Sequence, residues 1–255
     1  MLILIYGNIQ RKTLDVFFIT IELSIFAFKI NILALILNIE TATKNCSVSI
    51  AEEGKTIALK ELNDGNYSHA EKLHKLIEQV VLEAKISLSD LKAIAVSKGP
   101  GSYTGLRIGV SAAKGLCFAL DLPLISVNTL QSLALSVSID KGYKIPLLDA
   151  RRMEVYSQVF SEKNEKIREV YADIIDSDSF SDFLNTEKVY FFGDGAEKCK
   201  EIITYKKAVF IDHIFPSAKE MSVLSYQKYG NNEFEDVAYF EPFYLKEFLG
   251  EMPKK

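Results

Sequence analysis

The residues of this chain that could perform chemistry are few and widely spaced. Asp149 follows an apolar run, so it would stand at the end of a strand, where a carboxylate can serve in catalysis or bind magnesium. Arg151 and Arg152 come directly after it and could hold a phosphate. The same segment also makes an ordinary turn, and we favour that structural interpretation. With Glu40 in the first half and Asp194 in the second, the acidic set is thin for hydrolysis, so we assign no catalytic residue.

Two of the histidines, His69 and His74, fall in one predicted helix, five residues apart. This spacing places them about 140° apart around the helix axis. They therefore cannot bind one ion from one face, as histidines four residues apart do in zinc helices. We predict no metal site, and we expect His69, near the start of the helix, to be a surface or interface residue.

A glycine-rich segment, residues 97–109, lies between a predicted strand at 91–96 and a predicted helix at 103–120. Ser102 is placed to cap that helix, whose first N–H groups have no partner within the helix and can bind an anion. The segment is not a P-loop, and tight glycine turns also occur in α/β folds without a ligand. We name as candidate nucleotide or phosphate contacts Thr41, Thr43, Gly101, Ser102 and Asp149.

The predicted helix at 103–120 carries small residues on one face, at Gly105, Gly109, Ala112 and Ala113. Such a stripe allows another backbone to approach closely. Either a partner chain uses the stripe or the helix packs it inward against its own domain.

Composition limits the possible classes of protein. The 255 residues suit one large domain or two small ones, and 48% hydrophobic residues are enough for a core. A net charge of −4 argues against a protein that grips nucleic acid by itself. The three cysteines form no CxxC pair, which indicates reduced thiols in a cytosol-like compartment.

Residues 1–32 are expected to lie outside the fold. Asp15 and Glu22 interrupt their apolar run, leaving it too short to span a bilayer, and a signal-peptide layout is missing. Our hypothesis is that translation begins near Leu33; an interfacial anchor is the weaker alternative.

From Leu33 onward, alternating and helical patterns predict an ordered α/β chain. Three hairpin-linked strands followed by helices are typical of an actin-like half, although a plain β-meander would begin in the same way. The predicted strands are residues 33–39, 46–51, 55–62, 91–96, 124–127, 143–148, 154–160, 166–171 and 188–192. The predicted helices are residues 68–84, 103–120, 128–137, 177–184 and 215–229, with a further helix opening at the glycine turn 193–196 and an aromatic tail at 239–246 docking on its own domain.

Four segments together resemble the TsaB (YeaZ) family. They are ILNIETATKNCSV at 36–48, GPGSYTGLRIG at 99–109, DARRMEVY at 149–156 and EPFYL at 241–245. The resemblance implies an actin-like (ASKHA, ribonuclease H-like) α/β fold of two related lobes, at 33–137 and 138–255. It also implies a non-catalytic subunit that acts with TsaD in transferring threonylcarbamoyl to N6 of adenosine 37 in tRNAs reading ANN codons.

The resemblance further implies a set of partners and an interface. TsaD would form a heterodimer with the chain, TsaE would join a ternary complex, and the chain alone would be a homodimer. tRNA would bind only to the complex, and no membrane would be involved. No cofactor is implied, and whether a nucleotide binds at the TsaD interface is left open by the sequence. The implied interface residues are His69, Leu73, Leu76, Ile77, Val80, Gly105, Ile108, Gly109, Ala112 and Ala113. The alternatives are an independent actin-like ATPase or kinase, or a glycoprotease-like peptidase.

Overall fold

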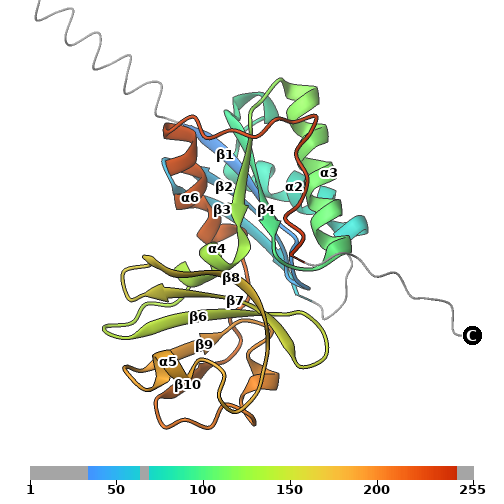
Figure 1. Cartoon of the computed structure of the whole chain (residues 1–255). Helices are drawn as coiled ribbons and strands as arrows, with labels where there is room; N and C mark the ends of the chain where they lie inside the picture. Colours follow the sequence, from blue (N-terminus) through green and yellow to red (C-terminus); the bar gives the residue numbers. More distant parts are fainter. Residues whose placement is uncertain (1–33, 64–68, 246–255) are drawn as a thin grey trace, which may run out of the picture. The chain divides into compact units, whose positions relative to one another are not determined.

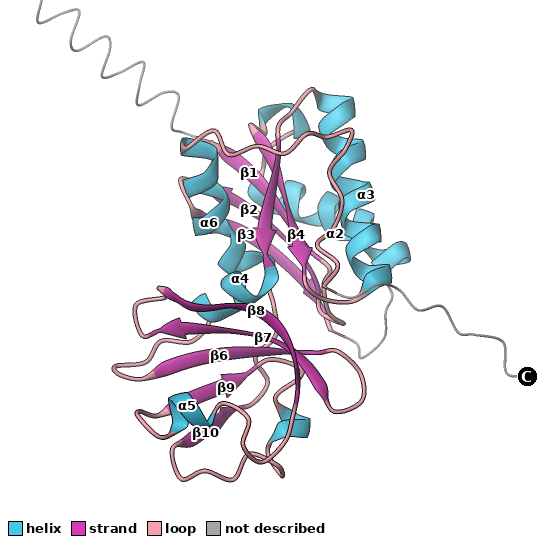
Figure 2. Ribbon diagram, viewed as in Figure 1, coloured by secondary structure: helices cyan, strands magenta, loops and turns pink. Residues whose placement is uncertain are grey.

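The fold is built on two five-stranded mixed sheets with the same topology (Figure 2). The computed structural model describes residues 34–63 and 69–245; the predictions for residues 1–32, for Ser68 as a helix cap and for Lys246 at the end of the aromatic tail lie outside these. The first sheet has the order β3-β2-β1-β4-β5 and the second β8-β7-β6-β9-β10. In each sheet three antiparallel strands are followed by two parallel ones. This repeat confirms the actin-like α/β fold of two related lobes.

The first sheet belongs to the N-terminal lobe, with helices on both faces (Figure 1). Its strands and helices are β1 (Leu35–Glu40), β2 (Cys46–Glu52), β3 (Lys55–Leu62), α2 (His69–Ala84), β4 (Ala93–Gly99), α3 (Tyr103–Leu120), β5 (Leu124–Asn128) and α4 (Thr129–Leu135), with a 3₁₀ turn at Leu88–Asp90. Alternate residues of a strand point to opposite faces of the sheet. Leu37 and Ile39 therefore join the core under α2 and α3, whereas Asn38 faces the other side and donates to Ser49.

The second sheet belongs to the C-terminal lobe. Its elements are β6 (Tyr143–Asp149), β7 (Glu154–Ser161), β8 (Lys166–Ile174), α5 (Ser181–Leu184), β9 (Val189–Phe192) and β10 (Ala208–Ile211), with a 3₁₀ turn at Glu197–Cys199. Phe191 and Leu147 lie in the core on one face, and Phe192 and Leu148 pack against α4 on the other. Both faces of this sheet are therefore covered by its own helices, turns and α4.

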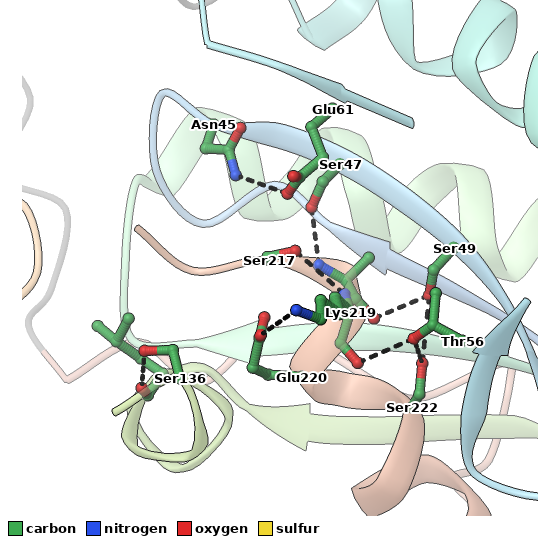
Figure 3. Close-up of polar contacts among 12 residues, drawn as sticks. Asn45, Ser47, Ser49, Thr56, Glu61, Ser136, Ser217, Lys219, Glu220 and Ser222 are labelled. Atoms are coloured by element: carbon green, nitrogen blue, oxygen red, sulfur yellow. Dashed lines mark hydrogen bonds and ion pairs between the residues drawn. The ribbon is translucent and has the colours of Figure 1, made fainter. Parts of the chain in front are cut away.

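The last helix, α6 (Ala218–Gly230), packs on the first sheet although it follows the second in sequence. Its contacts with that sheet include hydrogen bonds: Ser47 Oγ accepts from the Ala218 N–H, and Ser49 Oγ donates to the Ala218 carbonyl (Figure 3). Thr56 Oγ1 and Ser222 Oγ form a hydrogen bond of 2.8 Å in the same layer. The polar residues of β2 and β3 are thus satisfied by a helix that we had placed in the C-terminal lobe.

Three predicted elements need correction. The helix expected at 177–184 begins at Ser181, because the Asp176 carboxylate accepts from Asp178 N–H and Ser179 Oγ and forms a turn instead. The glycine turn at 193–196 opens a 3₁₀ turn rather than a longer helix, and β10 was missed. The aromatic tail docks on the N-terminal lobe and not on its own: Phe243 N–H donates to the Lys98 carbonyl of β4.

Candidate docking site

A groove of about 700 Å³ runs between α2 and α3 on the outside of the N-terminal lobe. The helices are amphipathic, and the sides that face the first sheet are buried, which leaves their outer sides to form the groove. Most of the lining is small or apolar. The lining residues are Ala70, His74, Tyr103, Thr104, Arg107, Ile108, Ser111, Ala112, Gly115 and Leu116.

Only Ile108 and Ala112 of the predicted interface residues line this groove. The apolar residues of α2 that recur with the 3.6-residue period form the side of α2 that faces the core, since this periodicity marks the buried side of a helix. They are at most 8% exposed and pack against the first sheet: Leu73, Leu76, Ile77 and Val80. We had predicted these four residues on an interface, and the structure places them in the core of the lobe instead.

The small-residue stripe of α3 receives a turn of the same chain. A Cβ on Gly105 would overlap the Thr41 carbonyl oxygen, and one on Gly109 would overlap Thr41 Oγ1. Ala113, on the same side, is fully buried. Gly105, Gly109 and Ala113 of the stripe thus serve the close approach of the β1–β2 turn, which was the inward alternative, whereas Ala112 lines the groove.

The two histidines of α2 lie on different sides of the helix, as their spacing predicts. His69 is buried, not exposed as expected, and its Nε2 donates to the Thr43 carbonyl at 2.7 Å. His74 lies on the groove. In the part of the chain that is described, no group of three or more His, Cys, Asp and Glu residues could hold a metal ion.

The groove has one permanently charged lining residue, Arg107. Its guanidinium donates to Tyr103 Oη at 3.0 Å, and its Cζ lies 5.3 Å from the centre of the Tyr103 ring. A cation over an aromatic face is attracted to it and loses some freedom of movement. The lining contains no carboxylate, so Arg107 supplies its one permanent charge.

Four of the candidate nucleotide contacts, Thr41, Thr43, Gly101 and Ser102, meet at the β1–β2 turn, and the hydrogen bonds of Thr41, Thr43 and Ser102 go to neighbouring residues of the same chain. Ser102 N–H donates to the Ala42 carbonyl, and Ser102 Oγ accepts from Gly105 N–H as the expected cap of α3. Thr43 Oγ1 accepts from Asn45 N–H. A Cβ on Gly101 would overlap Ala42. This turn therefore holds the starts of α2 and α3 together, and nucleotide binding there stays a prediction.

Glu40 ends β1 inside this arrangement and is fully buried. Its Oε1 accepts from Ala42 N–H at 2.7 Å, and its Oε2 has no partner. Burial raises the pKa of this carboxyl to about 7, against the lowering effect of its hydrogen bonds with Ala42, Ser97 and Thr41. The carboxyl of Glu40 therefore exchanges a proton near neutral pH, next to the β1–β2 turn that contacts the starts of α2 and α3.

Asp149 lies at the end of β6 on the other sheet, and it bonds Asp194, Arg151 and Lys198, none of them in the β1–β2 turn. The repeat places Asp194 beside it: the Asp149 N–H donates to Asp194 Oδ1, and burial raises the pKa of Asp194 to about 6. Lys198, missed in the sequence, bonds Asp149 Oδ1 at 2.5 Å and the carbonyls of Arg152 and Glu154. The signal in the sequence that could have identified Lys198 is its position four residues after Asp194, beyond the glycine turn.

Fold and groove together define a two-lobed actin-like protein with an open groove between two helices of its N-terminal lobe. The model of the family "TsaD: tRNA N6-adenosine threonylcarbamoyltransferase" matches residues 65–247. The chain therefore belongs to the family that this model defines, and within it to the TsaB (YeaZ) proteins. No helix of the described ranges, 34–63 and 69–245, has the length and apolar character needed to cross a membrane.

Individual relatives agree with this assignment. The chain is 33% identical to the tRNA threonylcarbamoyladenosine biosynthesis protein TsaB of Bacillus subtilis over 54% of this chain and 60% of that protein. It is 28% identical to the TsaB of Haemophilus influenzae over 83% of this chain and 93% of that protein. A crystal structure of a Pseudomonas aeruginosa protein similar to peptidase YEAZ matches its fold with a TM-score of 0.71 and 24% identity, over 84% of this chain and all of that one.

Proposed function

We propose that this chain is the partner subunit of a TsaD-type transferase in the formation of threonylcarbamoyladenosine at position 37 of tRNA. The observation that carries the proposal is the groove between α2 and α3, an open, largely apolar surface on the outside of the lobe. A helix of the partner fits such a surface because helices pack by setting ridges of side chains into grooves. The B. subtilis and H. influenzae relatives are named for threonylcarbamoyladenosine biosynthesis.

The role proposed for the chain is non-catalytic. What supports it is that the acidic groups at the strand ends already interact within the protein. Lys198 forms an ion pair with Asp149, and Glu40 is buried at the end of β1, beside the turn that contacts the starts of α2 and α3. TsaD would carry out the transfer, and the chain would stabilise it through the groove. We extend the proposal to a ternary complex with TsaE, to a homodimer in the absence of TsaD, and to tRNA bound only by the complex.

A matched pair of glycine variants tests the groove. Gly115 of α3 lines it and Gly230 of α6 lies away from it, and a Cβ at either position meets no atom within 4 Å. Gly115→Leu would fill the groove without disturbing the fold, whereas Gly230→Leu adds the same side chain elsewhere. We expect Gly115→Leu to weaken TsaD binding at least tenfold and to abolish tRNA modification by the reconstituted set, and Gly230→Leu to behave as wild type.

Two results would overturn the proposal. One is equal binding of TsaD by wild type and folded Gly115→Leu, which would remove the groove from the interface. The other is hydrolysis of ATP or peptide by the purified chain alone, lost in Asp149→Asn, which would favour the independent ATPase, kinase or peptidase.

A further inference from the structure

The C-terminal segment of the described chain, residues 235–245, crosses back over the N-terminal lobe, and we call it the C-terminal strap. It is the red segment that runs along α3 in Figure 1. It is fixed at its start where Glu235 N–H donates to the Leu124 carbonyl, and near its end where Phe243 N–H donates to the Lys98 carbonyl. Lys114 of α3 donates to the carbonyls of Ala238 and Phe240 between these points. The strap is therefore held to β5, α3 and β4 in turn.

The strap ends in an aromatic contact behind the groove. The Tyr244 ring lies 4.9 Å from the Tyr103 ring, at an interplanar angle of 36°. Tyr103 in turn holds Arg107 by the hydrogen bond and the cation–π contact described above. Tyr103 and Arg107 line the groove, whereas Tyr244 does not. The three side chains form a column that leads from the strap to the charged end of the groove.

The contacts among Tyr244, Tyr103 and Arg107 reduce the conformational entropy that Arg107 would otherwise lose on docking. An exposed arginine has many rotamers, and fixing it on association costs free energy that a positioned side chain has already lost. The guanidinium is weakly hydrated and accepts a carboxylate in a two-bond geometry. A groove with an apolar floor and a positioned arginine at one end therefore fits an apolar helix that carries an Asp or Glu.

We propose that the C-terminal strap shapes the docking groove, and that Tyr244 is a positioning residue that holds Tyr103 and Arg107 where a carboxylate of the partner's helix meets the guanidinium. This inference rests on the proposed function and adds to it a partner chemistry and a controlling element. It gives the C-terminal end of the chain, distant in sequence from α3, a direct influence on the affinity of the groove.

The test measures TsaD binding by the full chain at several NaCl concentrations. Tyr244→Ala should raise Kd about tenfold, because it removes the ring contact that positions Tyr103 and, through Tyr103, the guanidinium of Arg107. It should also flatten the salt dependence of Kd to the slope seen with Arg107→Gln, since the lost interaction is between charges. The double variant should bind no more weakly than Arg107→Gln alone.

Tyr239→Ala is the matched control. Tyr239 lies in the same strap and is 85% exposed, so its removal should change neither Kd nor the salt slope. Tyr103→Phe keeps the ring contact with Tyr244 but loses the oxygen that accepts from Arg107, and it should flatten the salt slope even if Tyr244→Ala melts early.

The possible failures are distinct. A wild-type chain that does not bind TsaD overturns the proposed function and this inference together. A wild-type chain that binds, with Tyr244→Ala and Tyr103→Phe keeping its Kd and salt slope, overturns only the role of the strap. A Tyr244→Ala chain that loses affinity at every salt concentration equally, with Tyr103→Phe unchanged, shows a structural role and overturns the inference as well.

Discussion

At the scale of single residues, the informative positions are polar or small groups enclosed by the fold. Glu40 is a carboxyl with no exposure and one unpartnered oxygen, and Gly105 and Gly109 have no room for a side chain beside Thr41. All of them meet at the β1–β2 turn. This turn is therefore where single substitutions should have their largest effect on stability.

Glu40 makes stability depend on pH in a predictable direction. With a pKa of about 7 in the folded chain, against an ordinary value of 4.5, the folded state keeps a proton that the unfolded state loses. The contribution is full below pH 4.5 and is lost as pH rises through 7, a change of roughly 3 kcal/mol in the free energy of unfolding. Urea unfolding between pH 4.5 and 8 should show this fall in wild type. Glu40→Gln should lack the part of the fall above pH 6, because Asp194, whose pKa burial raises to about 6, contributes to the fall only at lower pH and does so in both chains.

The control for this measurement is Glu201→Gln, at an exposed carboxyl. Its pH profile should parallel that of wild type. Identical profiles for wild type and Glu40→Gln would mean that Glu40 is ionised in the folded chain.

The fully enclosed Gly109 should be a stability residue rather than a docking residue. Gly109→Leu forces a side chain into Thr41, and overpacking typically costs ~1–3 kcal/mol. We expect a lower melting temperature for the isolated chain, with Gly115→Leu on the same helix melting as wild type or slightly higher, because leucine favours helix over glycine. Equal melting of the two variants would contradict the assignment of the stripe to internal packing.

At the scale of elements, the bounds of α3 follow from its own sequence, whereas the end of α4 depends on hydrogen bonds from another element. α3 begins after the Ser102 cap and ends at Leu120, as its sequence predicts. α4 is short, and its last carbonyls would be left without partners. The fully buried Lys144 of β6 donates to the carbonyls of Ala134 and Val137 and bonds Asn164. A residue of the second sheet thus satisfies the end of a helix of the first lobe.

Lys144→Met should therefore destabilise the chain by about 1–3 kcal/mol, since it keeps the volume but leaves two buried carbonyls unpaired. Burial already lowers the pKa of Lys144, so the lost hydrogen bonds are partly offset by the removal of a buried charge. Denaturant unfolding measures the difference. Lys141→Met, which removes an exposed ion pair with Glu187, should stay within about 0.5 kcal/mol of wild type. Equal stabilities of the two variants would show that α4 needs no cap from β6.

At the scale of the whole molecule, the three thiols report on the two lobes separately. Cys46 and Cys117 lie in the core of the N-terminal lobe and Cys199 in that of the C-terminal lobe. Burial raises the pKa of Cys46 and Cys117 to about 12 and that of Cys199 to about 11, so all three are unreactive thiols in the folded chain.

Thiol labelling should accordingly follow unfolding. At neutral pH a soluble alkylating reagent should modify none of the three thiols within minutes, and all of them in 8 M urea. Because α4 joins the lobes through buried contacts with the second sheet, we expect peptide mass spectrometry at intermediate urea to find the three labelled together. Earlier labelling of Cys199 alone would show that the second lobe opens independently.

Much of the fold could be predicted from the sequence because its signals are local. Alternation marked the strands of each hairpin, the 3.6-residue period marked α2 and α3, and Ser102 marked the start of α3. The sequence motifs were sufficient for the TsaB family. The candidate site was less accessible, since periodicity shows that a helix side is apolar but not what covers it.

The sequence by itself determined the order and type of most elements, the two-lobe repeat and the family. Only the tertiary structure decided that the small-residue stripe holds the Thr41 turn, that α6 and the strap return to the first lobe, and that the groove lies on the other side of α2 and α3. The physical reason is range. Propensity, capping and periodicity act within a few residues, whereas burial depends on contacts between segments more than a hundred residues apart, as Tyr103 and Tyr244 are.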